Sequence, residues 1–206
     1  MKILIALVLI FCGNILSLED VDISKAKHRL TISTGSAYHI FQEEFFSTNG
    51  GGLFGPDFIP EYSPGSLFGI ELGLELSDFT LALRSNYSRF SGTIEGIDLR
   101  KDSYTISGGA YVKIWESGRA RFYANTFVNY YILDHKSDFE GVTYRTQRYS
   151  LLSAGIFGEF FFNEYFSLGL SPEIDFYTIF FDNSELNNPP IYFRINVNIS
   201  IYSNAL

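Results

Sequence analysis

The sequence predicts an all-β fold, an eight-stranded antiparallel up-and-down β-barrel that crosses a membrane, preceded by a cleavable signal peptide. Three observations support this fold class. The chain begins with an apolar leader of the secretory type, about eight later segments alternate between apolar and polar residues, and the connections between them alternate in length. With 206 residues the chain accommodates one such domain.

The leader is the first element along the chain. Lys2 precedes an apolar run over residues 3–11, and small and polar residues follow it. This run is shorter than the roughly 18 residues expected of a membrane-spanning helix. We therefore expect a signal peptide over residues 1–17, a short lead over 18–27 and the barrel over 28–206. Cys12 is the only cysteine, so removal of the leader leaves no disulfide.

The clearest pair of strands lies over residues 68–88. The first strand reads FGIELGLEL, in which the apolar residues Phe, Ile and Leu alternate with Gly and Glu. A two-residue turn at Ser77 and Asp78 would place Leu72 opposite Leu83, and Glu71 opposite Arg84. Both apolar faces then coincide, and we expect Glu71 and Arg84 to form a cross-strand ion pair.

Six further segments complete the predicted barrel. They cover residues 29–39, 102–114, 121–132, 150–160, 166–176 and 191–202. Pro172 interrupts the seventh strand, and we expect a bulge there because proline lacks the N–H that a closed barrel would pair. The first connection, about residues 41–65, is long and the next is very short, and the even strand count places both termini at the rim of short turns.

The orientation of the two faces separates a membrane barrel from a soluble one. A soluble lipocalin-like carrier would turn its apolar face inward around a ligand. Here the apolar face carries almost no charge in seven of the eight strands, as contact with lipid requires. Aromatic residues also gather near both strand ends, in the manner of two interfacial girdles, with Tyr87, Phe90 and Tyr104 toward the long connections and Trp115, Phe122 and Phe162 toward the short turns. The sequence therefore favours the membrane barrel.

The polar face then lines the lumen. We expect a network of ion pairs formed by Glu71, Glu75, Glu159, Glu173 and Asp175 with Arg84, Lys113, Arg121 and Arg194. Eight strands enclose space for side chains alone, and an unpaired buried ion costs several kcal/mol at least. A filled polar lumen is thus favoured over a gated ion path.

The composition and the histidines exclude several functions. A net charge of -8 disfavours a nucleic-acid partner, which requires a concentrated basic face. His28, His39 and His135 show neither metal-ligand spacing nor a catalytic partner, so we expect no catalytic, metal or cofactor site and no enzymatic activity.

The first long connection contains the candidates for surface recognition, which are Phe45, Phe46, Phe54, Phe58 and Tyr62. These aromatic residues could equally extend the barrel wall or fold over its mouth. These interpretations stay open at the level of sequence.

Over residues 28–203 the strand pattern, the girdles and the alternating connections resemble the small outer-membrane β-barrel proteins, of the OmpA transmembrane domain and OmpX type. The resemblance implies a monomer in a Gram-negative outer membrane, with extracellular long loops and periplasmic termini. Its implied partners are outer-membrane lipid and lipopolysaccharide, the barrel-assembly machinery, and an extracellular ligand or surface. A structural or adhesin-like role is favoured, and a small-solute pore and a lipid-modifying enzyme are the alternatives.

Overall fold

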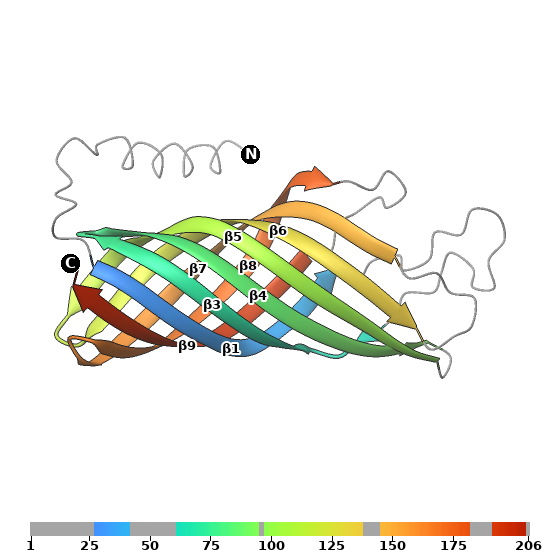
Figure 1. Ribbon diagram of the computed structural model, residues 1–206, viewed down its shortest axis with the longest axis horizontal. Helices are drawn as coiled ribbons and strands as arrows, with labels where there is room; N and C mark the ends of the chain where they lie inside the picture. Colours follow the sequence, from blue (N-terminus) through green and yellow to red (C-terminus); the bar gives the residue numbers. More distant parts are fainter. Residues whose placement is uncertain (1–26, 42–60, 95–96, 138–144, 182–190, 205–206) are drawn as a thin grey trace.

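A computed structural model describes residues 27–41, 61–94, 97–137, 145–181 and 191–204, which form one closed antiparallel β-barrel (Figure 1). Its strands are β1 (Lys27–Phe41), β2 (Glu61–Tyr62), β3 (Gly65–Leu76), β4 (Phe79–Ile94), β5 (Ile97–Ser117), β6 (Ala120–Ser137), β7 (Arg145–Asn163), β8 (Phe166–Phe181) and β9 (Ile191–Asn204). Each of the eight long strands pairs with its neighbours in sequence, and β1 pairs with β9 to close the barrel. The predicted eight-stranded barrel is confirmed. The expected signal peptide lies outside the described residues, and within these residues no helix is long and apolar enough to cross a membrane.

The register of the first hairpin agrees with the sequence. Leu72 lies opposite Leu83, and Glu71 lies opposite Arg84. The chain reverses through Ser77 and Asp78, where Ser77 has a φ of 53°, a conformation that non-glycine residues adopt mainly in tight turns. Lys27 lies opposite Asn204, so the start of β1 and the end of β9 meet at one end of the barrel (Figure 1, left). We call this the short-turn end and the other the long-loop end.

The strands continue further toward the long-loop end than the alternation predicts. β4 and β5 remain paired as far as Ile94 and Ile97, so the connection expected between them is mostly strand. β5 has 21 residues, whereas a membrane-spanning strand needs roughly 9–11. The additional outward positions carry polar residues such as Ser91, Thr93 and Asp98, which is why apolar alternation fades there.

The prediction of a bulge at Pro172 is wrong. On either side of this residue β8 keeps one register with β7, since Glu173 lies opposite Gly155 and Leu170 lies opposite Gly158. Pro172 itself stays paired with Ile195 of β9. The missing N–H therefore interrupts the ladder to β7 without shifting it. The register shifts of this strand pair fall elsewhere, between Ser150 and Leu151, between Leu152 and Ser153, and between Phe161 and Asn163.

The apolar face of the wall is turned outward. The exposed fraction is 60% for Leu72 and 59% for Leu83, against 3% for Glu71 and 5% for Arg84. Exposed apolar side chains continue around the barrel at Ile32, Ile106, Val128, Ile156, Leu170 and Ile199. This arrangement is that of a transmembrane barrel and opposite to that of a soluble carrier with an apolar interior. The prediction that Phe90 belongs to the interfacial girdle is wrong, because its side chain is buried in the lumen.

The exposed belt leads to a first prediction. Leu72→Arg should lower the free energy of unfolding from lipid vesicles by about 2–4 kcal/mol, because a charged side chain would enter the hydrocarbon region. Ser66→Arg is the matched control, since Ser66 is exposed on the same face of β3 near the long-loop end. Urea titration of vesicle-inserted protein measures both, and equal losses would contradict a lipid-facing Leu72.

Candidate functional site

The lumen is the candidate site, and aromatic side chains occupy both of its halves. Toward the short-turn end a buried cluster consists of Ala82, Tyr111, Tyr123, Phe127 and Phe157. Toward the long-loop end a second cluster consists of Ala37, Leu67, Phe90, Tyr131, Leu133, Tyr149, Leu151 and Tyr192. In the sequence, Tyr123 and Phe127 look like breaks in the apolar face of β6. They instead alternate in step with the inward-facing Asn125 and Asn129.

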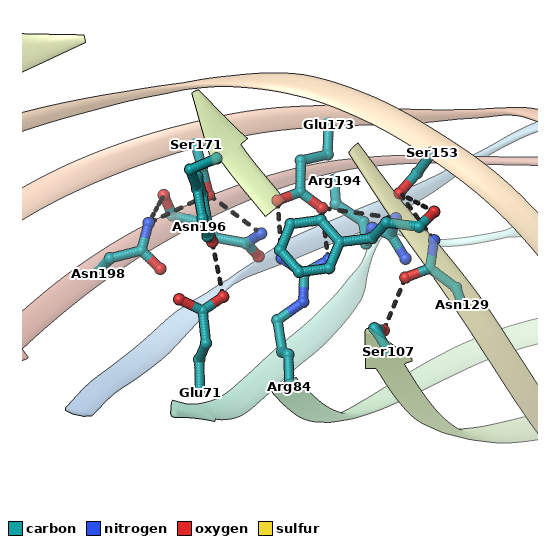
Figure 2. A network of polar contacts seen from close by, with 12 residues as sticks. Glu71, Arg84, Ser107, Asn129, Ser153, Ser171, Glu173, Arg194, Asn196 and Asn198 are labelled. Carbon is teal, nitrogen blue, oxygen red and sulfur yellow. Dashed lines mark hydrogen bonds and ion pairs between the residues drawn. The ribbon is translucent and has the colours of Figure 1, made fainter. Parts of the chain in front are cut away.

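A layer of ion pairs separates the two aromatic clusters. Arg84 donates two hydrogen bonds to Glu173, at 2.7 Å and 2.8 Å, in a bidentate arrangement. Arg194 donates to Asp175 at 2.9 Å and lies 3.6 Å from Glu173. Figure 2 shows Arg84 and Arg194 approaching Glu173 from different strands. We call Arg84, Glu173, Arg194 and Asp175 the central ion layer.

The aromatic clusters cover the central ion layer on both sides. The Arg84 guanidinium lies 4.1 Å from the ring centroid of Phe127, which belongs to the first cluster. Tyr131, of the second cluster, donates to Asp175 at 3.0 Å and accepts a hydrogen bond from Arg194. All four charged side chains are at most 5% exposed, so the layer is shielded from water and its charges neutralise one another.

The expected direct ion pair between Glu71 and Arg84 is wrong, although the two residues lie opposite each other. Glu71 accepts hydrogen bonds from Arg29 at 2.6 Å and from Tyr111 at 2.6 Å. Arg84 reaches instead across the narrow lumen to Glu173. Gly73 helps to explain why Glu71 pairs with Arg29. A Cβ at position 73 would lie 3.1 Å from Nε of Arg29, so glycine leaves room for this side chain. Sequence reasoning missed Arg29, yet its place in the alternation of β1 puts it on the inward face.

The remaining predicted ions form separate groups near the short-turn end. Arg121 pairs with Glu75 at 3.0 Å and with Glu116 at 2.8 Å. Lys113 pairs with Glu116 at 2.8 Å and with Asp78 at 3.3 Å. These side chains are partly exposed, so they close the end of the lumen rather than its centre.

Glu159 belongs to neither of these groups. It accepts hydrogen bonds from Ser167 and, at 2.6 Å, from Tyr202. The nine predicted ions therefore do not form one continuous network but lie in separate groups along the lumen.

Among the described residues, the cavity beside the central ion layer is small. A cavity of about 10 Å³ lies among Asn86, Ser103, Tyr131 and Arg194, just beyond the central ion layer. Such a volume is enough for about one water molecule. Side chains rather than an open passage therefore fill the lumen at this level.

The described part of the chain shows one candidate for surface recognition. Tyr62 is half-buried, with its ring centroid 6.5 Å from that of Phe90 and 4.9 Å from Nζ of Lys101. Tyr62 also pairs with Gly92 of β4 as part of β2, so its backbone extends the barrel wall while its ring folds over the mouth. Phe45, Phe46, Phe54 and Phe58, and the side chains of His39 and His135, lie outside the described part. Among the described residues no group of three His, Cys, Asp or Glu could hold a metal ion.

Comparison with known proteins identifies the fold. No protein-family model and no curated protein matches the sequence. Solved structures do match, among them the outer membrane protein OprG of Pseudomonas aeruginosa, with a TM-score of 0.59 and 10% identity over 88% of this chain and 97% of that one. Neisserial surface protein A gives 0.53 and 9%, over 85% and 96%. The attachment invasion locus protein Ail of Yersinia pestis, in complex with the heparin analogue sucrose octasulfate, gives 0.52 and 13%, over 86% and 98%. At these identities the chain shares the fold of small outer-membrane β-barrels.

The pairing within the central ion layer can be tested by double-mutant cycles. Arg84→Gln alone should destabilise the barrel by about 3–5 kcal/mol, because it leaves Glu173 without its bidentate partner. Combined with Glu173→Gln, the losses should be strongly non-additive, with a coupling of about 1–3 kcal/mol. The matched control combines Arg84→Gln with Glu71→Gln and should show a smaller coupling. A larger coupling to Glu71 than to Glu173 would contradict the observed partners.

Proposed function

We propose that the protein is a non-enzymatic outer-membrane barrel with a closed lumen, which anchors in the membrane and presents its long-loop end as an interaction surface. The observation that carries this proposal is the central ion layer, whose charges are buried and paired across the barrel. Such a barrel has a structural or adhesin-like role, with long loops extracellular and termini periplasmic.

The closed lumen argues against the small-solute pore. A conducting path needs charges that stay hydrated and exchange partners with passing ions. Here Glu173 is held by Arg84 of β4 and by Arg194 of β9, and aromatic rings cover these contacts on both sides. The polar groups therefore connect opposite walls of the barrel, which suits a structural plug.

The long-loop end supports the surface role. β4 and β5 project beyond the length that the membrane requires, and Tyr62 packs over the mouth between Phe90 and Lys101. Two proteins of the same fold are named as a surface protein and an attachment protein, and the latter was crystallised with a heparin analogue. These names support an outward-facing interaction for this chain.

Conductance separates the plug from the pore. In planar bilayers the purified protein should show no steady unitary current, because the central ion layer fills the lumen. The Arg84→Ala/Glu173→Ala variant removes one neutral pair and should admit ions more readily. A gel in which unboiled and boiled samples migrate differently confirms that both proteins are folded. A steady current through the unaltered barrel would favour the pore.

The loop can be tested separately. Replacing residues 43–60 with a Gly-Ser linker of equal length should abolish binding of the protein to cell or matrix surfaces, while Glu61 and Tyr62 still close the mouth. Arg119→Gln, in a turn at the opposite rim, is the control and should leave binding unchanged. Undiminished binding after the loop replacement would exclude this segment as the recognition surface.

A further inference from the structure

A charged cluster lies on the outer wall of the barrel, at the long-loop ends of β4 and β5. Arg89 alternates with the exposed Leu81 and Leu83 along β4, and Arg100 and Asp102 alternate with the exposed Tyr104 and Ile106 along β5. This cluster therefore faces away from the lumen. The side chains of Arg89 and Arg100 are 46% and 42% exposed, whereas that of Asp102 is 1% exposed beneath them.

Asp102 holds both arginines in place. Its carboxylate accepts hydrogen bonds from Nε of Arg89 at 3.0 Å and from Nε of Arg100 at 3.2 Å, and it pairs with Nη2 of Arg100 at 2.8 Å. Tyr87 donates its hydroxyl proton to Asp102 at 2.7 Å and accepts a hydrogen bond from Arg89 at 2.9 Å. The two guanidinium groups are thus oriented before any ligand arrives.

The cluster retains unused donors. One arginine would neutralise Asp102, and the second leaves a net charge of +1 on the three side chains, which the carboxylate of Asp134, opposite Asp102 on the outward face of β6, balances. The free guanidinium donors, rather than the net charge, therefore distinguish the cluster. Within the described part of the chain, Nη1 and Nη2 of Arg89 and Nη1 of Arg100 make no hydrogen bond. Pre-oriented guanidinium donors of this kind suit a phosphate group, whose oxygens accept paired N–H bonds.

The level of the cluster on the wall indicates which phosphate lies within reach. Tyr87 and Tyr104 lie opposite each other, with ring centroids 5.1 Å apart, at the upper edge of the exposed apolar belt. Arg89 and Asp102 form the next outward-facing pair beyond them. Tyrosines at the edge of an apolar belt mark the headgroup level of a membrane. Since this end carries the long loops, that level belongs to the outer leaflet of the proposed outer membrane.

We propose that Arg89 and Arg100, positioned by Asp102, bind the phosphate group of an anionic glycolipid of the lipid A class in the outer leaflet. This inference rests on the proposed outer-membrane placement and adds a defined lipid site to it. The cluster's position on the wall favours a lipid over a soluble polyanion, because acyl chains of the same molecule can cover Tyr104 and Ile106 directly below.

Native mass spectrometry of the folded barrel in detergent, titrated with diphosphoryl lipid A, tests the proposal. The Arg89→Gln/Asp102→Asn/Arg100→Gln variant removes all three charges and leaves no unpaired carboxylate. It should bind the lipid about fivefold more weakly, since the cluster loses one net positive charge and each such charge near an anionic lipid surface contributes roughly fivefold. The Arg89→Lys/Arg100→Lys variant keeps both positive charges but loses the paired N–H donors of the planar guanidinium groups, and it should bind with intermediate affinity.

Arg119→Gln is the matched control, because it makes the same change in net charge at the short-turn rim. An equal loss in this control, or no loss in the triple variant, would overturn the proposal. So would a triple variant that keeps lipid A binding but loses binding of a heparin oligosaccharide, which would assign the cluster to a soluble polyanion. If the triple variant does not fold, Arg89→Gln alone decides, with an expected loss of about fivefold. None of these outcomes depends on conductance or on residues 43–60, so they are separate from the tests of the proposed function.

Discussion

The structure depends on one constraint, which is that every charge enclosed by a lipid-facing wall must find its partner inside. The wall exposes Leu72 and Leu83 outward, so the lumen has no neighbouring water along its sides to solvate Arg84 or Glu173. The bidentate contact between them and the adjoining pair of Arg194 and Asp175 satisfy this requirement at the centre of the barrel. The aromatic clusters on either side then exclude water and fix the positions of the charged groups.

This constraint also links the interior of the barrel to its role. A lumen filled by paired charges stabilises the wall, and under the proposed function the groups available to external ligands lie at the rim and on the outer surface. There the strands rise beyond the apolar belt, and charged groups such as Arg89 and Arg100 stay accessible because water and headgroups solvate them. Charged groups inside the barrel are therefore stabilised by one another, and those on the outer surface by water and headgroups.

The sequence predicted the faces and the first register because both follow from alternation and from a two-residue turn. It did not predict which charged residues pair. The register of one hairpin gives the neighbours along the wall, but it does not show which side chains meet across the lumen, as Arg84 and Glu173 do. Arg29 was missed since β1 alternates weakly, and the strand ends were missed since their outward residues are polar. Pro172 shows that a closed barrel can lose one backbone hydrogen bond without changing register.

The origin of the central ion layer from distant strands constrains how the barrel assembles. Arg194 lies on β9, the last strand, and it supplies the cation for Asp175 on β8. A partial barrel that still lacked β9 would hold an uncompensated carboxylate beside lipid and two unpaired strand edges, each of which is costly in hydrocarbon. Closure of the ring and neutralisation of its interior therefore coincide, which makes insertion of this chain an all-or-none event.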